Sequence, residues 1–166
     1  WYVYSSVVEG RASLNKVKTT GGAVPVVLKA DMDGLGASGQ AWSPANDWIL
    51  YRDHDASLKL ISPDGETTRD VAAPNTLVAA FSPDGRTLYG LSQKEPADPV
   101  ELFSVSVTGG SSKTIGLLPT DRAPRASATP GLRLSLAPDG KSLTYSAARA
   151  VSGLWLMDGI DAVKVR

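Results

Sequence analysis

The sequence predicts an all-β chain built from repeated four-stranded antiparallel sheets. The ten-residue phrase "FSPDGRTLYG" at 81–90 recurs in altered form at 42–51 and 136–145. Short apolar strings flank each copy, a pattern typical of strands joined by tight turns. No apolar stripe with the helical period of about 3.6 residues extends over a helix-length segment, so few or no helices are expected.

Two independent sets of positions define the repeat. In the first phrase, a proline precedes a tyrosine by six or seven residues, as Pro83 precedes Tyr89. In a second phrase, a leucine precedes a glycine by 7 residues in three of the copies. Its leucines are spaced by 44, 44 and 52 residues and are Leu14, Leu58, Leu102 and Leu154. Because both sets recur in the same order, the chain contains true internal repeats.

Each repeat is interpreted as four short strands, a to d. The "SPDG" phrase predicts a tight a–b turn, because proline fixes φ, aspartate bonds its own backbone and glycine accepts positive φ. In the copy at 42–51, Ala45 and Asn46 replace the Asp-Gly pair. Asparagine also tolerates the left-handed region, so a turn is still expected there. The c–d turn carries Gly-Gly or a second "PDG".

Several strands are apolar on both sides, for example "WILY" at 48–51. Such strands belong to sheets that are covered on both faces. Four-stranded sheets that cover one another are the blades of a β-propeller. We therefore expect residues 1–166 to form a single or partial propeller of about three and a half to four blades, at approximately 1–28 (partial), 38–72, 76–116 and 132–166. The tryptophans are expected to pack between blades; they are Trp1, Trp42, Trp48 and Trp155.

The repeat phrase resembles that of TolB-like, WD-related β-propeller proteins of bacteria. The similarity is clearest in "AAFSPDGRTLYGLS" (79–92) and "LSLAPDGKSLTYSAA" (134–148), and it extends over nearly the whole chain. The resemblance implies a sensor or scaffold part of a larger bacterial protein. It favours the periplasm over the cytoplasm, although the residues themselves leave the compartment open.

Propellers of this family have more blades than this chain can supply. The first repeat also lacks its "SPDG" half, which would precede Trp1. We therefore expect the chain to be the C-terminal arc of a larger propeller. An arc that is not closed would expose apolar blade faces and unpaired strand edges, so self-association through those faces is a further expectation.

Composition argues against several classes of protein. Lysine plus arginine and aspartate plus glutamate each number 17, and the basic residues are scattered. Nucleic-acid binding is therefore not expected. The chain has no cysteine and one histidine, so a zinc site is not expected. No apolar run approaches the ~20 residues needed to cross a bilayer, so this segment is not expected to insert into membranes.

The sequence contains no convincing catalytic constellation. His54 lies between Asp53 and Asp55, which could orient a base as in a catalytic triad. No nucleophile elbow accompanies them, and a solvated turn is the simpler interpretation. "DMDGLG" at 31–36 resembles the start of a calcium loop, but Leu35 and Trp42 occupy positions that need oxygen ligands. We expect no catalytic residue, metal or cofactor.

Loop lengths indicate where recognition occurs. In an up-and-down blade, the a–b and c–d turns lie at one end, and the b–c and d–a connections lie at the other. The longer segments all belong to the second set, including 118–131, and binding residues favour such loops. This end is therefore predicted to bind a protein or peptide. The candidate residues are Glu9, Arg11, Asp53, His54, Lys94, Arg122 and Arg125.

Other interpretations remain open at this point. The long loops could be permissive insertions with no binding role. The chain could form a substrate-gating part of a hydrolase such as a serine peptidase, with the active residues elsewhere. It could also be a structural element that completes a ring with another chain.

Overall fold

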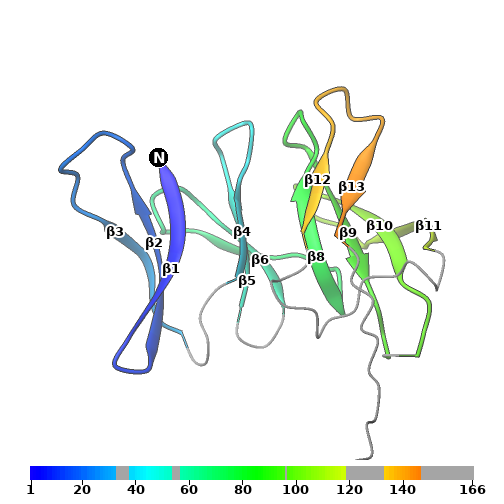
Figure 1. Cartoon of the computed structure of the whole chain (residues 1–166), viewed down its shortest axis with the longest axis horizontal. Helices are drawn as coiled ribbons and strands as arrows, with labels where there is room; N and C mark the ends of the chain where they lie inside the picture. Colours follow the sequence, from blue (N-terminus) through cyan, green and yellow to red (C-terminus); the bar gives the residue numbers. More distant parts are fainter. Residues whose placement is uncertain (33–37, 54–56, 96, 119–132, 147–166) are drawn as a thin grey trace, which may run out of the picture.

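The computed structural model describes residues 1–32, 38–53, 57–95, 97–118 and 133–146, which form antiparallel sheets and no helix (Figure 1). The first sheet contains β1 (Tyr2–Val8), β2 (Arg11–Val17) and β3 (Val26–Met32). The second has the order β4 (Ser38–Trp42), β5 (Ile49–Arg52), β6 (Leu58–Ile61) and β7 (Thr68–Asp70). The described residues confirm the all-β class.

The third sheet consists of β8 (Thr76–Phe81), β9 (Thr87–Ser92), β10 (Glu101–Ser106) and β11 (Lys113–Leu117). In the fourth sheet, β12 (Leu134–Leu136) pairs with β13 (Leu143–Tyr145). Strand β4 lies against both β1 and β8, and β12 lies against β8. The first strands of the sheets are therefore neighbours, as they are around a propeller axis.

The two ends of the sheets differ in their connections. The β2–β3, β4–β5, β8–β9 and β12–β13 turns lie at the upper end in Figure 1, and the β1–β2 and β9–β10 connections lie at the lower end. We name the upper end the turn face and the lower end the loop face. The candidate site described below lies at the loop face.

Hydrogen bonds explain why the "SPDG" phrase is repeated. In the β8–β9 turn, the Asp84 carboxylate accepts bonds from the Ser82 hydroxyl at 2.6 Å and the Arg86 amide at 3.0 Å. Gly85 has φ of 71° and donates its amide to the Ser82 carbonyl. In the β4–β5 turn, Asn46 has φ of 60°, so the expectation that a turn survives there is confirmed.

The Asp84 carboxylate in the β8–β9 turn is expected to make the free energy of unfolding fall in acid. The Ser82 hydroxyl and the Arg86 amide lower the pKa of Asp84 below its ordinary 3.8. A lowered folded-state pKa stabilises the fold above that ordinary value, and the stabilisation is lost as the pH falls through the folded-state pKa. Asp84→Asn keeps an oxygen acceptor but cannot titrate. Urea unfolding below about pH 4 should show a shallower pH dependence for this variant than for the wild type; equal slopes would contradict the assignment.

The second sheet is buried on both of its faces. Leu50, Leu58 and Leu60 pack against Phe81 and Leu88 of the third sheet. On the opposite face, Ile49, Tyr51 and Ile61 pack against Leu14 and other side chains of the first sheet. The prediction of strands covered on both sides is confirmed here. This continuous apolar packing is what holds neighbouring sheets side by side.

Turn glycines also allow the sheets to approach closely. A Cβ built on Gly65 would lie 2.8 Å from the carbonyl oxygen of Leu28 in the first sheet. A Cβ on Gly85 would lie 2.8 Å from the hydroxyl oxygen of Ser43 in the β4–β5 turn. Glycine is therefore needed at each position for two reasons, because it accepts positive φ and because it leaves room for the neighbouring sheet.

The tryptophans differ in their burial and packing. Trp42 packs against the core between the first and second sheets, and Trp48 packs against the core between the second and third. Packing between sheets is confirmed for these two. For Trp1 the expectation is wrong, because its side chain is 51% exposed and lies beneath the ammonium groups of Lys16 and Lys18. Trp155 lies outside the described residues.

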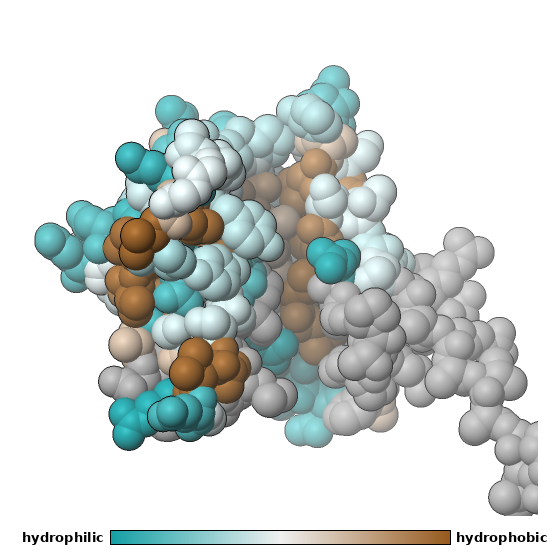
Figure 2. All heavy atoms as spheres, turned by 60° about the vertical axis from the view of Figure 1, so that its left-hand side comes forward, coloured by the Kyte–Doolittle hydropathy of each residue, from teal (hydrophilic) through white to brown (hydrophobic). Residues whose placement is uncertain are grey.

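The first sheet exposes apolar side chains to solvent. Figure 2 shows brown patches on this side of the molecule. The large exposed side chains here are Tyr2, Val7, Val8, Val24, Val26 and Val27. Tyr2 also stacks on Tyr4, with ring centroids 6.2 Å apart. We name this set the first-sheet patch. Exposed apolar groups of this kind often mark contact surfaces.

Candidate functional site: a pocket at the loop face

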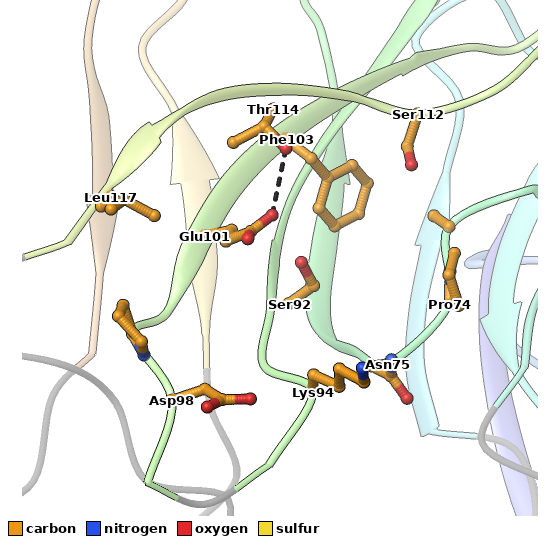
Figure 3. Close-up of a pocket in the computed structure, with 12 residues that line it drawn as sticks. Pro74, Asn75, Ser92, Lys94, Asp98, Glu101, Phe103, Ser112, Thr114 and Leu117 are labelled. Carbon is orange, nitrogen blue, oxygen red and sulfur yellow. Dashed lines mark hydrogen bonds between the residues drawn. The ribbon is translucent and has the colours of Figure 1, made fainter.

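A pocket of about 400 Å³ lies between the β7–β8 connection and the outer strands of the third sheet (Figure 3). Asn75 of the β7–β8 connection lines one side, and Lys94 and Asp98 of the β9–β10 connection line another. Strands β10 and β11 contribute Glu101 and Thr114. Its volume falls within the range typical of ligand sites, about 300–1,000 Å³.

A β-bulge shapes the wall formed by β10 and β11. Glu101 pairs with Leu117 and Phe103 pairs with Thr114, and the register shifts between Leu102 and Phe103. The extra residue places Thr114 and Leu117, although three apart in sequence, on the pocket side of β11. Thr114 can then donate its hydroxyl to Oε2 of Glu101 at 3.0 Å (Figure 3). This bond orients the Glu101 carboxylate within the pocket.

The loop that carries Lys94 and Asp98 is held by its own hydrogen bonds. The Gln93 side chain donates to the carbonyl of Asp98 at 2.8 Å, and the Glu95 amide donates to the Asp98 carboxylate at 3.1 Å. The Gln93 amide also donates to the carbonyl of Asn75 at 3.1 Å. The two connections that border the pocket are thereby joined, so the pocket has a defined shape.

The pocket separates its charges. In Figure 3, the carboxylate of Glu101 points into the pocket from β10, and that of Asp98 points into it from the β9–β10 connection. The Lys94 side chain extends toward Asn75. The Phe103 ring is 3% exposed and forms part of the wall. Such an arrangement offers a carboxylate subsite beside an aromatic ring and a separate ammonium donor. Among the described residues, no group of three or more His, Asp or Glu side chains is placed to hold a metal ion.

The structure separates the residues that the sequence proposed for binding. Lys94 lines the pocket. Glu9 and Arg11 lie at the β1–β2 turn, which is also at the loop face but belongs to the first sheet. Asp53 follows β5 and is buried. Three other candidates lie outside the described residues; they are His54, Arg122 and Arg125.

Asp53 forms an ion cluster between the first two sheets. Its Oδ2 lies 2.9 Å from Nζ of Lys29 in β3 and 3.2 Å from Nζ of Lys59 in β6. Burial lowers the pKa of Lys29, but hydrogen bonds to Asp53 and Tyr51 outweigh it, so the net shift is upward. The hydrogen bond to Asp53 raises the pKa of Lys59. The Asp53 carboxylate therefore already serves as an internal counter-ion.

Replacing Asp53 by alanine should destabilise the protein by about 2 kcal/mol, because two lysines lose a buried counter-ion. The loss stays moderate since both lysines can turn toward solvent. The control is Asp70→Ala, which removes an 84% exposed carboxylate 3.7 Å from Lys59 and should cost less than about 0.5 kcal/mol. Urea denaturation of both variants provides the measurement. Equal losses would show that Asp53 does not join the sheets.

Sequence reasoning missed the acidic side of the pocket. Glu101 begins the strand "ELFSVS", in which Glu101, Phe103 and Val105 alternate on one face. Phe103 and Val105 are buried. The Glu101 carboxylate on the same face of the strand was therefore a signal for a polar site at the edge of the core. The contribution of Thr114 carried no comparable signal, since it depends on the bulge.

No protein-family model matches the chain, and no curated protein matches it. The solved structures do contain similar folds. TolB from Acinetobacter baumannii is similar over 90% of this chain, with a TM-score of 0.66 and 18% sequence identity. A putative 6-phosphogluconolactonase from Bacteroides uniformis ATCC 8492 is similar over 83% of it, with a TM-score of 0.52 and 19% identity.

These similarities show the fold, which is that of a TolB-like β-propeller. The chain spans 36% of the length of the TolB chain and 41% of that of the second protein. It therefore corresponds in extent to part of each structure. No helix among the described residues is long and apolar enough to cross a membrane.

Proposed function

We propose that this chain is a non-catalytic binding module that recognises a protein or peptide at its loop face, within an arc of a larger bacterial propeller that acts as a sensor or scaffold. The observation that carries the proposal is the pocket between the β7–β8 and β9–β10 connections. It lies where rigid sheets hold loop residues, the usual position of binding sites on such scaffolds. Lys94, Asn75 and Asp98 are the loop residues that would contact the partner.

The fold by itself is compatible with either binding or catalysis, because one of the similar structures carries the name of a lactonase. The internal bonds of the site support its use as a binding surface. Thr114 already donates to Glu101, and the loop amide of Glu95 already donates to Asp98. These bonds stabilise the two side chains as fixed acceptors for a partner's donors.

Selection of peptides from a randomised library on the immobilised protein tests the proposal. Lys94→Glu should weaken the selected peptides at least about tenfold, because it reverses the charge at the pocket. Lys141→Glu is the matched control, since Lys141 is also exposed but lies in the β12–β13 turn on the turn face; it should change affinity less than about twofold. Selection of no peptide, or equal losses in the two variants, would refute recognition at the loop face.

Self-assembly is a second candidate, supported by the first-sheet patch. Tyr2 is 61% exposed and Val8 is 67% exposed on this sheet. If the patch associates with another copy, light scattering should show a mass that rises with concentration. Val8→Lys should then restore the monomer, because it would bury an unpaired charge in the contact. A constant monomeric mass in the wild type would exclude self-assembly through this patch.

A further inference from the structure

Resting on the proposed function, we propose that the pocket receives an arginine side chain of the partner peptide, with Glu101 as its counter-ion. The pocket's space of about 400 Å³ can hold one long side chain together with the adjoining peptide backbone. The orientation of the groups around it decides which side chain fits.

The Glu101 carboxylate can accept hydrogen bonds from a planar donor such as a guanidinium group. Thr114 bonds its Oε2, and among the described residues Thr114 is its one hydrogen-bond partner. This bond holds Oε2, and Oε1 has no hydrogen-bond partner among the described residues. A guanidinium matches a carboxylate with parallel hydrogen bonds, whereas an ammonium provides only a point charge. This geometry favours arginine over lysine.

Other groups around the cavity also favour an arginine side chain. Asp98 adds a second carboxylate on the same side (Figure 3). The wall also includes the largely buried Phe103, which gives the methylene groups of an arginine an apolar surface. Ser92, which pairs with Glu101 across β9 and β10, places a hydroxyl beside the same space. The Lys94 ammonium has no hydrogen bond or ion pair to a described residue and can donate to a carbonyl of the bound peptide backbone.

Titration with blocked alanine pentapeptides tests the inference directly. One peptide carries arginine at its centre, and the other carries citrulline, which has nearly the same shape and no charge. We expect the arginine peptide to bind with Kd of about 1 mM and the citrulline peptide at least about tenfold more weakly. Amide chemical shifts measured during the titration should change at Asn75, Lys94 and Glu101.

The variant Glu101→Gln separates charge from shape. Its amide oxygen can still accept the Thr114 hydroxyl, so thermal unfolding should remain close to that of the wild type. The preference for arginine over citrulline should fall from about tenfold to less than about twofold. Glu66→Gln, an exposed residue in the β6–β7 turn, is the matched control and should keep the preference.

Equal affinity for the two peptides, or an unchanged preference in Glu101→Gln, would overturn the arginine assignment. If library-selected peptides nevertheless depend on Lys94, the binding module stands and only the arginine assignment fails. If neither the pentapeptides nor the selected peptides shift amides at the loop face, both proposals fail.

Discussion

Substituting Gly65 by alanine should lower the free energy of unfolding by about 3 kcal/mol, one of the two largest losses expected in this chain. Gly65 has φ of 85°, which costs an L-residue strain. The new Cβ would also lie 2.8 Å from the carbonyl oxygen of Leu28 and 3.2 Å from its Cα. Because these are backbone atoms, only a shift of the first sheet relative to the second could relieve the contact.

Gly10→Ala is the matched control for this prediction. Gly10 has a similar φ of 78°, yet nothing lies within 4 Å of the position of its Cβ. It should therefore show the backbone strain alone, about 1 kcal/mol. Chemical denaturation of the two variants measures the difference. If both lose the same free energy, the close contact of the β6–β7 turn with the first sheet does not exist in solution.

Gly90→Ala should cost about 2–3 kcal/mol for a different reason. Gly90 is in β9 without positive φ, so the substitution adds no backbone strain. Its Cβ would lie 2.4 Å from Cζ of Phe103 and 2.9 Å from the carbonyl oxygen of Val78. The Phe103 ring is enclosed in the core, and the Val78 carbonyl belongs to the neighbouring strand β8, so neither can yield freely.

A double-mutant cycle with Phe103→Leu tests the origin of this loss. The shorter side chain should cost about 1–2 kcal/mol by itself. In its presence, Gly90→Ala should lose less than half as much stability as it does in the wild type, because the ring contact is gone. Additive losses would mean that Gly90 and Phe103 are not in contact. Since Phe103 also lines the pocket, displacement of its ring by the Gly90→Ala substitution should reduce binding there.

The fold was predictable because its signals are local. The "SPDG" turns follow from residue chemistry within four positions, and Asn46 accommodates positive φ as its side chain allows. The burial of Ile49, Leu50 and Tyr51 likewise follows from an apolar string whose alternate side chains face two neighbouring sheets. Trp1 was predicted wrongly because its exposure depends on which side chains neighbour it in space.

The site was less predictable because it is assembled from segments that are distant in sequence. Loop length directed attention to the connection that carries Lys94, which lines the pocket. Nothing in the sequence showed that Asn75 would face it from the β7–β8 connection, or that Asp53 would bond Lys29, 24 residues away. A role in recognition stays a prediction for the other candidate residues, which are Glu9, Arg11, His54, Arg122 and Arg125.

The most direct test of recognition at the loop face is to map the amide chemical shifts of the whole chain during titration with library-selected peptides. The proposal predicts changes that cluster at Asn75, Lys94, Asp98 and Glu101 around the pocket. Residues of the turn face, such as Gly85 in the β8–β9 turn, should stay unchanged. Changes confined to the turn face or to the first-sheet patch would contradict the proposal.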